Sequence, residues 1–188
     1  MNLFLGIDPG IVNTGWYILD ADNDRTGFGD TFTPSKYPDR FSAARGLIQV
    51  ISSACEKNDL SFNDIQTCYI ERYVAYAGKL NANTEPTLLL IGSLTFPLND
   101  RGITILEGRA IDWKPKVCKL LFSRHGFRNP SDKFDKEYSL AAAAEISGIV
   151  HKKDHTADAC CMAYLAREHF RNNPEFYHAK KVSQQPSN

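Results

Sequence analysis

Five short runs, apolar or rich in residues that favour β-structure, have the length of β-strands. The runs cover residues 3–8, 15–20, 26–33, 67–73 and 102–106. Pro9 and Gly10 lie in the turn after the first run, and polar residues follow the second. Runs of this kind predict buried or half-buried strands. Because the first three are consecutive, we expect them to form a meander.

Between residues 41 and 55, apolar residues recur at steps of three and four, the spacing of one helix face, which predicts a helix there. Further helices are expected over residues 85–94, where apolar residues cover almost the whole surface, and over residues 136–148 and 155–171. A further helix is expected to open with Trp113–Lys119, because Pro115 is tolerated in a first turn. The polar segment 123–133, which holds Gly126 and Pro130, is expected to be a loop.

The order of these elements predicts an α/β domain over residues 1–171. We expect a five-stranded mixed sheet, with three antiparallel strands followed by two parallel strands, flanked by helices. The polar segment 172–188 is predicted to be a disordered tail. A chain of 188 residues with 43% hydrophobic residues suits one domain with a proper core.

Charge and cysteine content narrow the class of protein only slightly. The chain has 22 basic and 22 acidic residues, but Arg109 to Lys153 holds ten Lys or Arg against five Asp or Glu. A solvated helical face would give the same pattern, so it permits a polyanionic partner without requiring one. Five cysteines without paired spacing predict a reducing compartment. With no signal segment and no membrane-spanning run, we expect a soluble, cytoplasmic protein with no membrane partner.

Three carboxylates stand where they could converge on one site. Asp8 ends the first predicted strand, Glu71 lies in the fourth, and Asp158 lies in the first turn of the last helix, three residues after His155. Pairing of the first and fourth strands would bring two of these acids to one edge of the sheet. Oxygen ligands of this kind suit Mg²⁺, and two ions about 4 Å apart can drive phosphodiester hydrolysis.

Each of these acids also has a structural interpretation. Asp8 before Pro9 could be a turn residue, Glu71 an exposed strand acid, and Asp158 a partner of the helix dipole. Asp154 is a rival metal ligand, four residues before Asp158. Its place just before the helical run favours an N-cap instead.

Taken together, the motifs resemble the RuvC family of Holliday junction resolvases, in the RNase H-like superfamily. The resemblance rests on Gly6-Ile7-Asp8-Pro9-Gly10 with Thr14-Gly15, on Ile70-Glu71-Arg72, on His155-Thr156-Ala157-Asp158-Ala159, and on the segments Trp113–Lys119 and Asp135-Lys136-Glu137. It implies a magnesium-dependent nuclease for four-way DNA junctions, with two ions per site and Mn²⁺ as a possible substitute. The metal ligands would be Asp8, Glu71 and Asp158, assisted by His155. The implied assembly is a homodimer that cuts two strands symmetrically.

The resemblance also assigns contacts to branched DNA. Lys119 and Lys136 would meet the scissile or neighbouring phosphates, and the DNA-positioning set is completed by Lys114, Lys116 and Lys133. Two aromatic residues, Tyr73 and Tyr76, compete as the wedge that stacks on unpaired bases. The apolar helix 85–94 corresponds to the helix used for dimerisation, although burial in the monomer core explains its pattern equally well. The segment 123–134 is longer and less glycine-rich than in the family.

Other protein classes share parts of this pattern. Actin- and hexokinase-like ATPases begin with a similar Gly-Ile-Asp-x-Gly hairpin, but they need two lobes and a second phosphate motif. A non-catalytic RNase H-like module would not require the three acids. A transposase or an RNA-cleaving nuclease of the superfamily would share the chemistry, so only the single-domain length and the lysine segments favour a resolvase.

Overall fold

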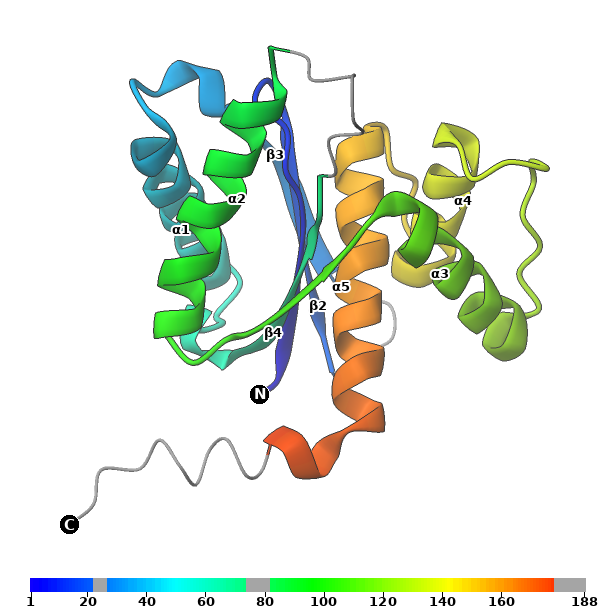
Figure 1. Cartoon of the computed structure of the whole chain (residues 1–188). Helices are drawn as coiled ribbons and strands as arrows, with labels where there is room; N and C mark the ends of the chain where they lie inside the picture. Colours follow the sequence, from blue (N-terminus) through cyan, green and yellow to red (C-terminus); the bar gives the residue numbers. More distant parts are fainter. Residues whose placement is uncertain (22–26, 74–81, 178–188) are drawn as a thin grey trace.

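The computed structural model describes residues 1–21, 27–73 and 82–177, and its centre is one five-stranded sheet (Figure 1). The strands are β1 (Leu3–Asp8), β2 (Thr14–Asp20), β3 (Gly27–Phe32), β4 (Ile65–Glu71) and β5 (Thr104–Gly108). Their order in the sheet is β3-β2-β1-β4-β5. The strands β1, β2 and β3 are antiparallel neighbours, whereas β4 is parallel to both β1 and β5. The predicted fold class is confirmed.

Helices cover both faces of this sheet and bury a separate apolar core on each (Figure 1). The helices are α1 (Arg40–Lys57), α2 (Thr84–Asp100), α3 (Ala110–His125), α4 (Lys136–Ser147) and α5 (Asp154–Asn172). On one face, α1 and α2 pack against the sheet. On the other face α5 lies along β1 and β2, and α3 and α4 pack beside it.

Two glycines let α5 lie directly on the sheet. A Cβ atom on Gly6 of β1 would stand 1.9 Å from the backbone oxygen of Ala159, and one on Gly15 of β2 would stand 2.0 Å from that of His155. Side chains at these positions would therefore push the helix away. The contact brings the first turn of α5 beside Asp8, so the packing of α5 positions the candidate site.

Several element boundaries differ from the sequence prediction. The strand β5 lies two residues later than expected, and α3 begins at Ala110, which places Pro115 in its second turn. Pro115 itself is exposed. The predicted loop at 123–133 begins only after His125, where Gly126 ends α3 in the left-handed conformation. Helix α2 runs on past Pro97 to Asp100.

The apolar residues of α2 divide between the monomer core and the surface. Leu90, Ile91 and Leu94 are buried against the sheet. These three residues therefore pack in the monomer core and are not available for a dimer contact. Leu88, Leu89 and Phe96 are exposed. They lie on the face of α2 that points away from the sheet.

The first residues of the predicted tail are ordered. Tyr177 is buried, and its hydroxyl lies 2.9 Å from both Thr67 Oγ1 and His169 Nδ1. Its ring also packs on Phe170 and Phe176. This packing differs from the tail predicted from residue 172, because one aromatic side chain anchors the segment up to residue 177; residues 178–188 lie outside the described residues, and the disorder of the tail stays a prediction. Within the described part of the chain, no helix is long and apolar enough to span a membrane.

Candidate active site

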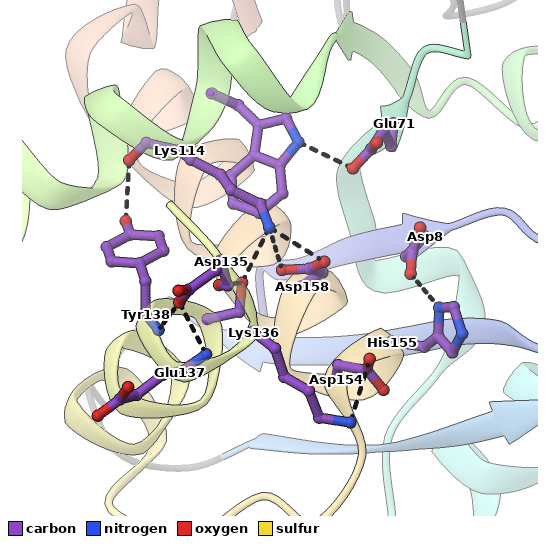
Figure 2. Close-up of polar contacts among 12 residues, drawn as sticks. Asp8, Glu71, Lys114, Asp135, Lys136, Glu137, Tyr138, Asp154, His155 and Asp158 are labelled. Carbon is purple, nitrogen blue, oxygen red and sulfur yellow. Dashed lines mark hydrogen bonds and ion pairs between the residues drawn. The ribbon is translucent and has the colours of Figure 1, made fainter. Parts of the chain in front are cut away.

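The three predicted carboxylates come from three elements that meet at one end of the sheet (Figure 2). Asp8 and Glu71 are the last residues of β1 and β4, and the parallel pairing of Ile7 with Ile70 sets these two ends side by side. Asp158 lies in α5, one turn after His155. All three side chains are partly buried. The charge of Asp8 acts on both other carboxyls, which places the three in one electrostatic site.

Each carboxylate is held by a different kind of side chain. The imidazole Nδ1 of His155 lies 2.6 Å from Asp8 Oδ2. The indole Nε1 of Trp113 donates a hydrogen bond of 3.0 Å to Glu71 Oε2. The ammonium of Lys114 lies 3.3 Å from Asp158 Oδ1.

Burial and mutual repulsion favour the protonated forms of two of these acids. Burial, followed by the charge of Asp8, raises the pKa of Glu71 to about 7, although the hydrogen bond from Trp113 acts in the opposite direction. Burial also raises the pKa of Asp158, with the Lys114 ammonium opposing the shift. A site that raises carboxyl pKa values in this way is a candidate for cation binding or acid–base chemistry.

The pKa of His155 is also raised, chiefly by its hydrogen bond with Asp8. The positive form of the imidazole is stabilised by an acid next to it, and here that acid is one of the three carboxylates. The sequence prediction that His155 lies at the site is thereby supported by geometry, and its chemical role stays a prediction.

Comparison of the whole fold places the site in a known architecture. No protein-family model matches the chain, and no curated protein matches its sequence. The structure of Thermus thermophilus RuvC aligns with a TM-score of 0.59 and 16% identity, over 92% of this chain and 96% of that one. The chain has the RuvC fold.

Two further solved structures agree with this result. T. thermophilus RuvC in complex with a Holliday junction substrate gives a TM-score of 0.59 at 15% identity, over 92% of this chain and 96% of the other. The yeast mitochondrial Holliday junction resolvase Ydc2 gives 0.50 at 15% identity, over 92% of this chain and 83% of the other. At this identity the likeness establishes the fold, and the chemistry must be argued from the residues of this chain.

Lys114 belongs to the site of this RuvC fold itself. Lys114 is predicted to position the DNA backbone, yet the residue is only 9% exposed, and its ammonium lies between Asp158 and Ser139, with Nζ 3.0 Å from Ser139 Oγ. Tyr138 donates a 2.8 Å hydrogen bond to the backbone oxygen of Lys114 (Figure 2). The buried stripe of α3 consists of Trp113, Lys114, Val117 and Leu121. A lysine in such a stripe calls for an acidic partner, which is the signal that could have identified it.

Lys119 lies on another part of α3, and its implied contact with the scissile or a neighbouring phosphate stays a prediction. It lies five residues after Lys114, about 140° around the helix. With Lys116 it lines a separate cavity of about 440 Å³, whose wall also includes Leu106 of β5 and Leu165 of α5. The lysine at the carboxylates is therefore Lys114.

The predicted N-cap role of Asp154 is wrong. Lys153 is the N-cap of α5, and Asp154 is the first residue of the helix. Its carboxylate lies 3.3 Å from the ammonium of Lys136, at the start of α4 (Figure 2). Partial burial raises the pKa of Asp154, but the hydrogen bond from Lys136 lowers it, and the pKa lies below its usual value. Lys136 thus reaches the rim of the site, and Asp154 is paired with it.

The structure describes the surroundings of two further predicted DNA contacts, Lys133 and Tyr73. Lys133 is exposed in the segment between α3 and α4. Tyr73 follows β4 by two residues and packs partly against the core under α1 and α2. Tyr76 lies outside the described residues. Of the two wedge candidates, only Tyr73 can be placed, and it stands just beyond Glu71.

The donor set fits a divalent metal ion in its chemistry. It consists of carboxylate oxygens, which Mg²⁺ prefers, and the buried Asp158 Oδ1 has the Lys114 ammonium 3.3 Å away but accepts no hydrogen bond from the described residues. In the described part of the chain, no three His, Cys, Asp or Glu side chains lie close enough together to hold an ion as they stand. Each carboxylate is instead turned to its own protein partner. The donor chemistry thus suits a divalent ion, while the three carboxylates as arranged here do not form a group that would hold one.

Proposed function

We propose that the protein is a structure-selective endodeoxyribonuclease that resolves four-way DNA junctions by metal-dependent hydrolysis of phosphodiester bonds. The observation that carries the proposal is the group of Asp8, Glu71 and Asp158 at one end of a RuvC-fold sheet. A two-lobed ATPase is not favoured, because the described residues form a single five-stranded sheet. The products would carry 3′-hydroxyl and 5′-phosphate ends.

The three carboxylates would hold Mg²⁺, with two ions per site and Mn²⁺ as a substitute. When bound, such ions activate a water molecule and stabilise the leaving oxygen. His155 would hold Asp8 in place and exchange a proton at its ring nitrogen. Lys114 would counter the negative charge of Asp158.

The DNA backbone would be bound by the basic side chains of α3, α4 and the segment between them. Lys116, Lys119, Lys133 and Lys136 are all exposed, and phosphate contacts of this kind supply most of the affinity for DNA. Tyr73, just beyond Glu71, would stack on an unpaired base at the branch point.

The exposed face of α2 would form the homodimer contact. Leu88, Leu89 and Phe96 are 45%, 48% and 77% exposed, and Gly92 lies between them with nothing within 4 Å of where a Cβ would be. Large apolar side chains around an open glycine allow a second helix to approach closely. Two copies related by a two-fold axis would carry two sites, as a symmetric cut in two strands requires.

The test is cleavage of labelled four-way junction, replication fork and linear duplex, with and without Mg²⁺. Paired symmetric nicks in the junction alone are expected, and only with the metal. Asp8→Asn should abolish cleavage and leave junction binding nearly unchanged, because it removes a ligand charge and no backbone contact. Undiminished cutting by Asp8→Asn would refute the metal site, and equal cutting of linear duplex would refute junction selectivity.

A further inference from the structure

The start of α3 presents two neighbouring side chains to two different carboxylates. Trp113 donates to Glu71 through its indole nitrogen, and Lys114 contacts Asp158 through its ammonium. Neither contact is local, since Trp113 and Glu71 are 42 residues apart in the chain. The proposed chemistry uses Glu71 and Lys114 but gives Trp113 no role.

Burial alone does not explain the hydrogen bond of Trp113. The chain has a second buried tryptophan, Trp16, which is 3% exposed, and its indole nitrogen has no hydrogen-bond partner among the described residues. Trp113 is 0% exposed, yet its indole nitrogen lies 3.0 Å from a carboxylate oxygen. A purely apolar ring would fill the same space. The indole adds one N–H group, which can only donate a hydrogen bond, and in Trp113 this donor is used on Glu71.

The indole is fully buried and has a cation beside its ring. The Lys114 ammonium lies 5.1 Å from the centre of the Trp113 ring, within the range of a cation–π contact. The backbone of Lys114 is fixed in turn by the hydroxyl of the buried Tyr138. The direction of the indole N–H is therefore set by the packing of α3 on α4 and α5.

We propose that Trp113 is a positioning residue for the metal site: its indole N–H holds one oxygen of Glu71, so that the other oxygen is presented to the ion. The inference rests on the proposed function only in taking Glu71 as a metal ligand. Partners that orient a metal-binding carboxylate typically change metal affinity by about 10- to 100-fold when removed. Trp113 thereby acts on the ion through Glu71 and does not touch the substrate.

The first experiment measures the hydrogen bond in the intact protein, without DNA. In the ¹H–¹⁵N spectrum at pH 8, the indole proton of Trp113 is expected downfield of that of Trp16. Glu71→Gln should move the Trp113 signal upfield, because a neutral amide oxygen is a weaker acceptor than a carboxylate. The Trp16 signal should stay in place. A Trp113 signal that does not move in Glu71→Gln overturns the proposal, whatever the stability of other variants.

The second experiment measures Mn²⁺ affinity by calorimetry, again without DNA. Trp113→Phe keeps a buried ring and removes the donor, and Trp16→Phe is the matched control. We expect Mn²⁺ affinity to fall by about 10- to 100-fold in Trp113→Phe and by less than about twofold in Trp16→Phe. In cleavage assays, raised Mn²⁺ should restore the rate of Trp113→Phe, with an unchanged KM for the junction. A merely structural role would lower the melting temperature without moving the metal dependence.

These outcomes separate the inference from the proposed function. Equal Mn²⁺ affinity of the wild type and Trp113→Phe overturns the role of Trp113 and leaves the nuclease intact. A wild type that binds Mn²⁺ but cuts no branched DNA overturns the nuclease, and the role of Trp113 at the metal site stands. A wild type that binds no divalent ion overturns both.

Discussion

Glu71→Gln should change how the stability of the metal-free protein depends on pH. Burial and the charge of Asp8 raise the pKa of Glu71 from 4.5 to about 7 in the folded protein. The folded state therefore holds this proton more tightly than the unfolded state. Between these two pH values the folded state binds more protons, so the free energy of unfolding falls as pH rises through this window.

The size of this effect follows from the shift. One pKa unit corresponds to about 1.4 kcal/mol, so Glu71 is expected to lower the free energy of unfolding by about 3 kcal/mol between pH 4.5 and pH 8. Glutamine has the shape of the protonated acid and does not titrate. The variant should thus resemble the wild type at pH 5 and be more stable at pH 8 by about 3 kcal/mol.

The assay is urea denaturation in the presence of a chelator, at pH values from 5 to 8. Glu107→Gln is the control, since Glu107 is an exposed acid on the neighbouring strand β5 and should keep the wild-type dependence. Adding Mg²⁺ at pH 8 should stabilise the wild type more than Glu71→Gln, because the ion favours the ionised carboxylate. Equal pH dependence of the wild type and Glu71→Gln would refute the electrostatic account of the site.

Three further predictions concern the lysines and the dimer. Lys114→Met leaves Asp158 buried without its cation and should lower the free energy of unfolding at pH 8 by about 3 kcal/mol, whereas Lys116→Met should change it little; equal denaturation midpoints would contradict this. Lys119→Ala should weaken binding to every DNA sequence and reduce the slope of log affinity against log salt concentration by about one unit, with Lys57→Ala of α1 as control. An unchanged slope would show that Lys119 makes no phosphate contact. Phe96→Asp should convert the dimer to a monomer in light scattering, and a persistent dimer would exclude the exposed face of α2 as the contact.

The sheet and its acids could be predicted from the sequence because their signals are local. An acid that ends a buried strand, as Asp8 and Glu71 do, lies at the end of the sheet whatever the details of packing. The direction of neighbouring strands also decides which ends lie together, since parallel neighbours end at the same edge of the sheet. To predict the position of Asp158 it was enough to predict where the last helix starts, and the sequence predicts this start at His155.

The partners of these acids could not be predicted in the same way. Trp113 meets Glu71, and Lys114 meets Asp158, through the rotation of α3 about its axis, which depends on how α3 packs on α5. Successive residues of a helix are rotated by about 100°, which puts Lys119 about 140° away from Lys114. Which of the two lysines faces the carboxylates therefore depends on how α3 packs. The N-cap prediction for Asp154 was wrong for a related reason: the partner of its carboxylate, Lys136, comes from another helix.

The geometry of the site depends finally on residues that have no side chain. Gly6 and Gly15 allow α5 to touch the backbone of β1 and β2, and this contact decides how far His155 stands from Asp8. Any larger residue would move the helix by more than the tolerance of a hydrogen bond, and with it both His155 and Asp158. The glycines beside Asp8 thus serve a purpose unlike that of a phosphate-binding hairpin. In an ATPase such glycines would open the backbone to a nucleotide, whereas here their surface is covered by α5, and the covered surface is what brings the third carboxylate to the other two.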